Sequence, residues 1–201
     1  MVSNRTRILT AIVMPVLLFL TACGVNSIPT AEENAKAKWA DVQSQYQRRA
    51  DLIPNLVATV QGYANQERNV LTAVTEARAS ATRVTVSPDQ LTDPAAMQRF
   101  AEAQGRLSQA IIPLQRLQEN YPELHSNENF MALQSQLEGT ENRIAVARRD
   151  YNQAVQEYNT TIRTFPAVIG ARIIYGSQPM QPFQAEEGAQ HAPTVNFGNG
   201  H

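Results

Sequence analysis

Apolar residues recur at alternating steps of three and four along most of the chain, the spacing of one face of an α-helix. Between about Glu32 and Val84 they form a heptad seam that two polar residues, Arg49 and Glu67, interrupt. The phase of the seam does not slip at Pro54. The pattern therefore predicts one long helix that Pro54 kinks but does not break.

Two further helices follow in the pattern. Asp93 and Pro94 are typical of a helix start, because an N-cap acceptor precedes a proline at the first helical position. This second helix should end at Pro122, and a third should run from an N-cap at Ser126 to Pro166. Each helix should be long, and the loops that join them are short.

No stretch of these residues alternates for long enough to be a strand, so the fold class is all-α. Short loops force neighbouring helices to be antiparallel. Residues 31–166 should form an elongated up-down bundle of three long helices. With the kink at Pro54 taken as a boundary, the helices can be counted as four.

The pattern changes after the third helix. Residues 167–176 contain an apolar run that extends to Tyr175 and is interrupted by Gly170 and Arg172. They should form a short segment that caps the bundle end or, less favoured, touches a lipid surface. Residues 177–201 are rich in glycine, proline, glutamine and histidine. They offer too little apolar surface to offset the ordering entropy, which predicts a disordered tail.

The first 22 residues have the features of a cleavable signal peptide. Arg5 and Arg7 precede the apolar stretch 8–20, and small residues lead to Cys23 in the lipobox-like sequence Leu20-Thr21-Ala22-Cys23. Lipidation of Cys23 by acyl chains such as palmitate would anchor the mature chain. The alternative is a retained transmembrane helix, although the run is shorter than the roughly 20 residues that a span needs.

The anchor predicts the location of the protein. Residues 23–30 would form the lipidated cysteine and a short tether, so the bundle would lie close to membrane lipid on the outer side of the cytoplasmic membrane, in the periplasm or at the cell surface. Gly24 favours transfer to an outer membrane, because aspartate at that position would signal retention. Whether the host cell has two membranes is left open.

Composition excludes several functions. Of 17 basic residues two lie in the leader, which leaves 15 against 18 acidic residues and no basic face for nucleic acid. A single cysteine permits neither an internal disulfide nor a thiolate metal cluster, and the three histidines have no ligand spacing. No catalytic triad or glycine-rich phosphate loop appears. We therefore expect no metal, no cofactor and no enzymatic activity.

Charged and polar residues beside the first seam form the candidate site. A charge at a seam position must be paired or hydrogen-bonded. One hypothesis is a recognition patch for a partner protein. The favoured alternative is that Arg49 pairs with an acid on the third helix, such as Asp150 or Glu157, and fixes the register of the bundle. The candidate residues are Arg48, Arg49, Asp51, Pro54, Asn55 and Glu67.

Four segments of the chain together form a recognisable series. They are Gln47-Arg48-Arg49-Ala50-Asp51-Leu52-Ile53-Pro54-Asn55-Leu56, Val74-Thr75-Glu76-Ala77-Arg78, Asn127-Glu128-Asn129-Phe130 and Glu141-Asn142-Arg143-Ile144-Ala145-Val146-Ala147-Arg148. In order and spacing these segments resemble the LemA family. The resemblance implies an antiparallel helical bundle with its N-terminus at a membrane, and no established catalytic activity. It suggests an integral membrane protein or a protease of the envelope as partner.

Two functions follow from these observations. The first is a lipid-anchored, non-catalytic scaffold or interaction module of the bacterial cell envelope. The alternative is a binding module or cryptic enzyme that receives a small molecule or peptide among polar residues of the bundle core. A water-accessible cavity bordered by Arg49 and Glu67 would favour this alternative. The oligomeric state does not follow from the sequence.

Overall fold

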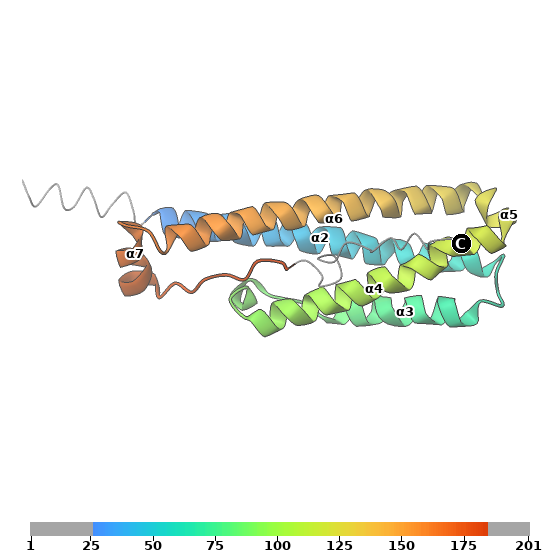
Figure 1. Ribbon diagram of the computed structural model, residues 1–201, viewed down its shortest axis with the longest axis horizontal. Coiled ribbons are helices and arrows are strands. Elements are labelled where there is room, and N and C mark those ends of the chain that lie inside the picture. The colour runs from blue at the N-terminus through green and yellow to red at the C-terminus, as the bar shows by residue number, and fades with distance from the viewer. Residues whose placement is uncertain (1–25, 185–201) are drawn as a thin grey trace, which may run out of the picture.

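The computed structural model describes residues 26–184, and their long helices run along one axis of an elongated rod (Figure 1). No strand occurs in this range, which confirms the all-α prediction. Short elements join the long helices or follow the last of them. The long helices are α2 (Ser27–Gln61), α3 (Arg68–Arg83), α4 (Pro94–Asn120) and α6 (Glu128–Thr161); the short elements are η1 (Pro88–Gln90), α5 (Pro122–His125), α7 (Ala167–Gly170) and η2 (Ala171–Tyr175).

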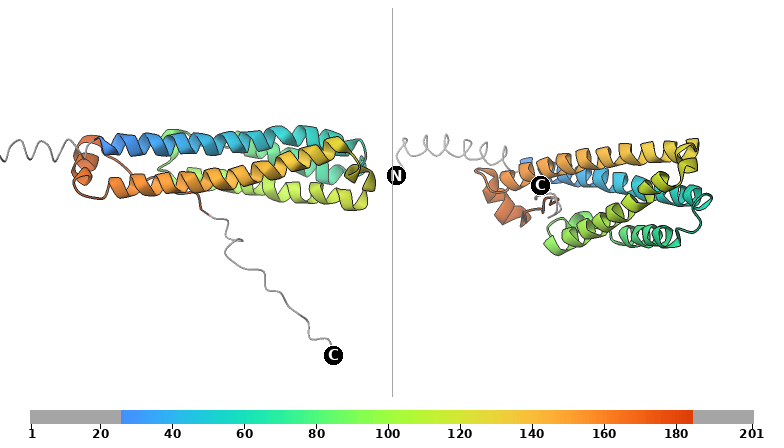
Figure 2. Two further views of the ribbon diagram at one scale, coloured as in Figure 1. Left: turned by 90° about the horizontal axis from the view of Figure 1, so that it is seen from above. Right: turned by 45° about the vertical axis from the view of Figure 1, so that its right-hand side comes forward.

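The long helices form two antiparallel pairs. Helix α6 lies along α2 for most of its length, and α4 lies beside α3, while α3 also contacts α2 (Figures 1 and 2). The loop after α2, the short α5 and the start of α6 meet at one end of the rod. The start of α2, the end of α6, α7 and η2 meet at the other end.

The prediction of one helix from about residue 32 to residue 84 is wrong. Helix α2 ends at Gln61, residues 62–67 form a turn, and α3 returns antiparallel to α2. Buried Ala64 holds this turn against the core. Both helices of this hairpin direct an apolar stripe toward the same core, so a continuous heptad phase carries no information about chain direction.

Other helix boundaries agree more closely with the sequence. Helix α2 continues through Pro54, as predicted. Asp93 caps α4 and accepts a hydrogen bond from the Ala95 amide at 2.9 Å. The cap of α6 is Asn127 rather than Ser126, because its Oδ1 accepts from the Phe130 amide at 2.9 Å.

The interior contains two hydrophobic clusters that lie one after the other along the rod. The first gathers aromatic side chains around Trp39, including Phe100 at 5.2 Å and Tyr151 at 5.2 Å between ring centroids. The second consists mainly of leucine and isoleucine side chains, such as Ile53 and Leu107. Polar side chains occupy the layer between them.

The prediction of a disordered tail from residue 177 onward is wrong for residues 177–184, which follow η2 and are ordered. Gly176 adopts φ +58°, a left-handed conformation that favours glycine, and turns the chain back along the bundle. Met180 and Phe183 are buried in the first cluster. Asn152 of α6 clamps Phe183, since it donates to the carbonyl at 2.9 Å and accepts from the amide at 2.7 Å. Residues 185–201 lie outside the described residues.

The predicted leader and Cys23 also lie outside the described residues. Between residues 26 and 184 no helix is both long enough and apolar enough to cross a bilayer. Asn26, which precedes α2, is the first residue that the structure describes after the predicted anchor.

Candidate functional site

The guanidinium group of Arg49 lies between the two hydrophobic clusters, and the residue is only 1 % exposed. Its Nη1 donates to Ser108 Oγ at 2.7 Å and to Glu141 Oε1 at 3.0 Å. Its Nη2 donates to Gln104 Oε1 at 2.8 Å and to the Gln104 carbonyl at 3.1 Å. One side chain of α2 is therefore bound to both α4 and α6.

Gln104 and Thr140 are also buried polar residues at this level of the rod. We call the whole set the polar layer; it consists of Arg49, Gln104, Ser108, Thr140 and Glu141. Gln104 Nε2 donates to the Ala81 carbonyl of α3 at 3.3 Å, so the layer reaches all four long helices. Thr140 is fully buried, and its hydroxyl donates to the Gln136 carbonyl at 2.7 Å. Arg49, Gln104 and Thr140 each replace an apolar residue in the seam of its own helix.

A second arginine is positioned by the proline within α2. Pro54 has no amide hydrogen, so the carbonyl of Ala50, four residues earlier, lacks its intrahelical donor. Arg78 Nε of α3 donates to this carbonyl at 2.7 Å. The proline therefore creates the acceptor through which α3 is attached to α2, one residue from Arg49.

The prediction that Arg49 pairs with an acid on the third helix is confirmed, but the acids named for it were the wrong ones. Its partner is Glu141, whereas Asp150 and Glu157 lie further along α6. Glu141 is 45 % exposed, so the ion pair joins a buried cation to a carboxylate that water can reach. The register hypothesis for Arg49 agrees with this geometry.

The remaining predicted residues do not join the polar layer. Arg48, Asp51, Pro54 and Asn55 are exposed on the outer side of α2, where Asp51 accepts a hydrogen bond from Gln47 at 2.8 Å.

Glu67 lies in the turn before α3, so it is not the buried seam residue that the pattern predicted. It is half-buried and accepts from the Tyr121 hydroxyl at 3.1 Å. This hydrogen bond joins the residue before α3 to the residue after α4 at one end of the rod.

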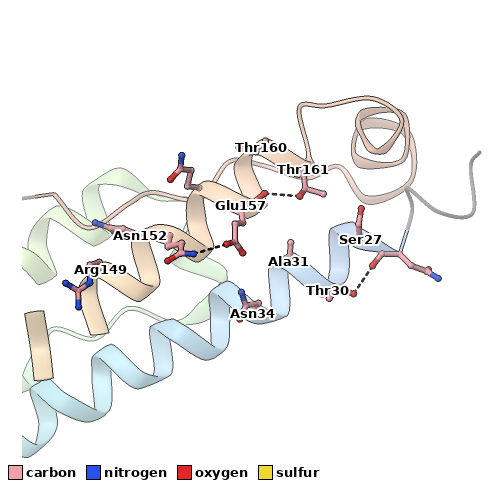
Figure 3. Close-up of a pocket in the computed structure, with 12 residues that line it drawn as sticks. Ser27, Thr30, Ala31, Asn34, Arg149, Asn152, Glu157, Thr160 and Thr161 are labelled. Carbon is pink, nitrogen blue, oxygen red and sulfur yellow. Dashed lines mark hydrogen bonds between the residues drawn. The ribbon is translucent and has the colours of Figure 1, made fainter. Parts of the chain in front are cut away.

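An open groove of about 1310 Å³ lies between the start of α2 and the end of α6 (Figure 3). Eleven of its twelve lining residues are polar, but several of these side chains already bond within their own helix, such as Gln153 to Glu157 at 3.2 Å and Thr161 to the Glu157 carbonyl at 2.8 Å. Neither Arg49 nor Glu67 borders it. The groove is thus distinct from the core cavity that a ligand-binding function would need.

Burial and pairing shift three pKa values near this end of the rod. Burial raises the pKa of Tyr151 and of Tyr158, so both phenols stay neutral, and Tyr151 donates to the Gln181 carbonyl at 2.9 Å. Hydrogen bonds from Lys36, first to Glu32 and then to Glu33, raise the pKa of the ammonium group. These groups serve packing and helix pairing.

Fold and site together define a class: a rod of four antiparallel helices whose core is divided by a polar layer centred on one buried arginine. The chain belongs to the LemA family, whose model matches residues 38–197. Three of the segments that carry the resemblance meet in one region, and the fourth forms the start of α6. Arg49, Arg78 and Glu141 come together at or beside the polar layer, and Asn127 caps α6 while its Nδ2 donates to Tyr63 Oη at 2.7 Å.

Curated relatives are more distant. The chain is 26 % identical over 157 residues to the magnetosome proteins MamQ 1 and MamQ 2 of Paramagnetospirillum magneticum. It is 25 % identical over 157 residues to magnetosome protein MamQ of Magnetospirillum gryphiswaldense. Each match covers 70 % of this chain and 58 % of the relative, so the chain spans less than two thirds of these relatives.

The polar layer predicts a specific pattern of stability changes. Arg49→Met leaves the buried Gln104 carboxamide oxygen without its donor and should lower the free energy of unfolding by about 3 kcal/mol. Adding Gln104→Leu removes that acceptor and should restore part of the loss, because an apolar layer can be as stable as a paired polar one, although the Ala81 carbonyl then loses its donor. Urea unfolding of the two variants measures both effects.

Glu141→Gln is the control for this cycle. Because Glu141 is 45 % exposed, the loss of its charge should cost less than about 1 kcal/mol. If the double variant is no more stable than Arg49→Met, the layer does not depend on matched polar partners.

The proline and Arg78 predict a second coupling. Arg78→Met should lower the free energy of unfolding by about 1–3 kcal/mol, because the Ala50 carbonyl loses its donor. In the Pro54→Ala background the loss should be smaller, since the introduced alanine supplies an amide hydrogen to that carbonyl. Arg83→Met, at an exposed position of the same helix, should cost little in both backgrounds. Equal losses for Arg78→Met in both backgrounds would contradict the explanation.

Proposed function

We propose that this protein is a lipid-anchored, non-catalytic scaffold or interaction module of the bacterial cell envelope. The observation that carries the proposal is the short distance along the chain between the lipobox cysteine and the rod. Cys23 precedes Asn26, the residue at the start of the 35-residue helix α2, by only three positions. A lipid on Cys23 would hold the rod by one end, close to the membrane surface.

The arrangement of polar groups supports an interaction role over a catalytic one. Both terminal nitrogens of the Arg49 guanidinium are used within the bundle, where they donate to Gln104, Ser108 and Glu141, and Arg49 is only 1 % exposed. A small-molecule function would need these groups to face a cavity. They instead hold the helices in register.

The outer side of α2 offers a surface for a partner. Arg48, Asp51 and Asn55 follow one another at steps of three and four, so they share one face of the helix and are exposed. The side chain of Arg48 makes no hydrogen bond or ion pair with the rest of residues 26–184. We propose that this face, which we call the α2 outer face, contacts another envelope protein.

Lipid attachment can be tested by metabolic labelling of a bacterium that produces the full chain. Radiolabelled palmitate should enter the wild type and not Cys23→Ser, and membrane flotation of the variant should fall accordingly. The matched control is Cys23→Ser combined with Ser27→Cys, which retains one cysteine but places it four residues beyond the lipobox. Label in this control would show that the lipobox position is irrelevant, and unlabelled wild type would overturn the anchor.

The α2 outer face can be tested by photocrosslinking in intact cells. A photoreactive residue at Asn55 should give a discrete adduct that mass spectrometry identifies as an envelope protein, and Cys23→Ser should weaken it, because the rod loses its lipid attachment. The control is the same residue at Asn69, an exposed asparagine of α3. The same adducts from both positions, or none from Asn55, would count against this surface.

A further inference from the structure

Large apolar side chains are exposed at the end of the rod where α2 begins. We call this set, which belongs to α7, η2 and the residues beside them, the apolar tip. It consists of Phe165 (73 % exposed), Ile169 (48 %), Ile173 (79 %), Ile174 (63 %) and Tyr175 (44 %). Five large apolar residues within eleven positions form a concentration that solvent contact does not favour.

The side chains that close the bundle at this end are different ones. Ala167 and Ala171 are buried in the first hydrophobic cluster, and Gly170 is buried beside them. Small residues thus face the core while the large ones face outward, the reverse of the usual pattern in a water-exposed helix. Capping of the bundle does not require the side chains of the apolar tip, which leaves their exposure to be explained.

The segment that carries the apolar tip has charge of one sign. Residues 162–184 contain two arginines, Arg163 and Arg172, and no aspartate or glutamate. Both arginines are exposed. An apolar surface with aromatic residues and a rim of arginine matches the boundary between headgroups and acyl chains of an anionic bilayer.

The position of the apolar tip points to the same surface. Helix α7 contacts α2, whose first residue is Ser27, so the tip lies at the end of the rod that the leader and Cys23 precede. The leader contains the apolar stretch 8–20. A lipid on Cys23 and a retained membrane helix would each place the bilayer at this end.

We propose that the apolar tip inserts into the headgroup region of the membrane and forms a second attachment beside the N-terminal anchor. This inference rests on the proposed membrane attachment and extends it. A single attachment point would let the rod swing. Two adjacent contacts bind as a linked pair, which raises the effective concentration of the tip at the lipid surface and orients the rod.

The experiment uses the full chain with one added thiol. If Cys23 is lipidated, its thiol is consumed, so Ile173→Cys carries the only site for a thiol-reactive NBD fluorophore. The matched control is Ile112→Cys, because Ile112 is also an exposed isoleucine (46 %) and lies on α4. Both proteins are reconstituted into vesicles of phosphatidylethanolamine and phosphatidylglycerol that contain doxyl-labelled lipids.

The NBD group at position 173 should shift its emission to the blue and lose most of its fluorescence to a doxyl group near the headgroup. A doxyl group deep in the acyl region should quench it less, since an interfacial segment penetrates only roughly 5–10 Å. The group at position 112 should show neither change. Adding Ile174→Asp to the Ile173→Cys chain should reduce the quenching.

Each of the other outcomes would overturn a specific part of the proposal. Proteins that float with the vesicles while position 173 stays unquenched would overturn the tip contact and leave the anchor intact. Disulfide-linked dimers through position 173, again unquenched, would assign the tip to a second copy of the chain. NBD incorporation into the parent chain would show a free Cys23 and overturn the lipid anchor, while quenching at position 173 would still support the tip. Absence of flotation would overturn the tip contact.

Discussion

A guanidinium group that is removed from water must have hydrogen-bond acceptors in fixed places, and this constraint organises the bundle. Arg49 has acceptors on α4 and α6. Sliding α6 along α2 by one heptad moves it roughly 10 Å at 1.5 Å per residue and would carry Glu141 out of reach. Apolar seams alone would tolerate such a shift, because leucine and isoleucine pack in several registers. The polar layer therefore selects one arrangement among those that the hydrophobic pattern allows.

A second arginine, beside this layer, explains why a proline is tolerated inside a long helix. Pro54 frees the carbonyl of Ala50, and a free carbonyl in a partly buried position costs stability unless a donor reaches it. Arg78 supplies that donor from α3 at 2.7 Å. Since α3 follows a reversed chain direction, this bond also fixes the hairpin of α2 and α3 next to Arg49. Two arginines thus hold four helices at one level of the rod.

The sequence predicted the features that local chemistry determines. The all-α fold, the cap at Asp93 and the passage of the helix through Pro54 follow from spacing and cap chemistry. The reversal at residues 62–67 did not follow, because a heptad seam has the same phase in both chain directions. Gly62 and Asn65, two weak helix formers within a helix of improbable length, were the available signal.

Only some of the partners of Arg49 could have been predicted from the sequence. Polar residues interrupt three seams, at Arg49, Gln104 and Thr140, and a layer that joins them could have been inferred from that coincidence. Which acid completes the layer depends on the offset between α2 and α6, which the turns at the far end set. The order of residues 177–184 also depends on tertiary contacts, since Asn159 binds the backbone of buried Met180 and Asn152 binds that of buried Phe183.

The helix register that the polar layer sets determines how far above a membrane the protein could bind a partner. Arg48 lies 21 residues after Ser27 in one continuous helix, which corresponds to about 30 Å at 1.5 Å per residue. A rod anchored at its apolar tip and standing upright would hold the α2 outer face at that height. A partner buried within the bilayer could not reach it without an extramembrane domain. Such a rod would select partners by height as well as by surface chemistry, and it could do so only because the polar layer prevents its helices from sliding.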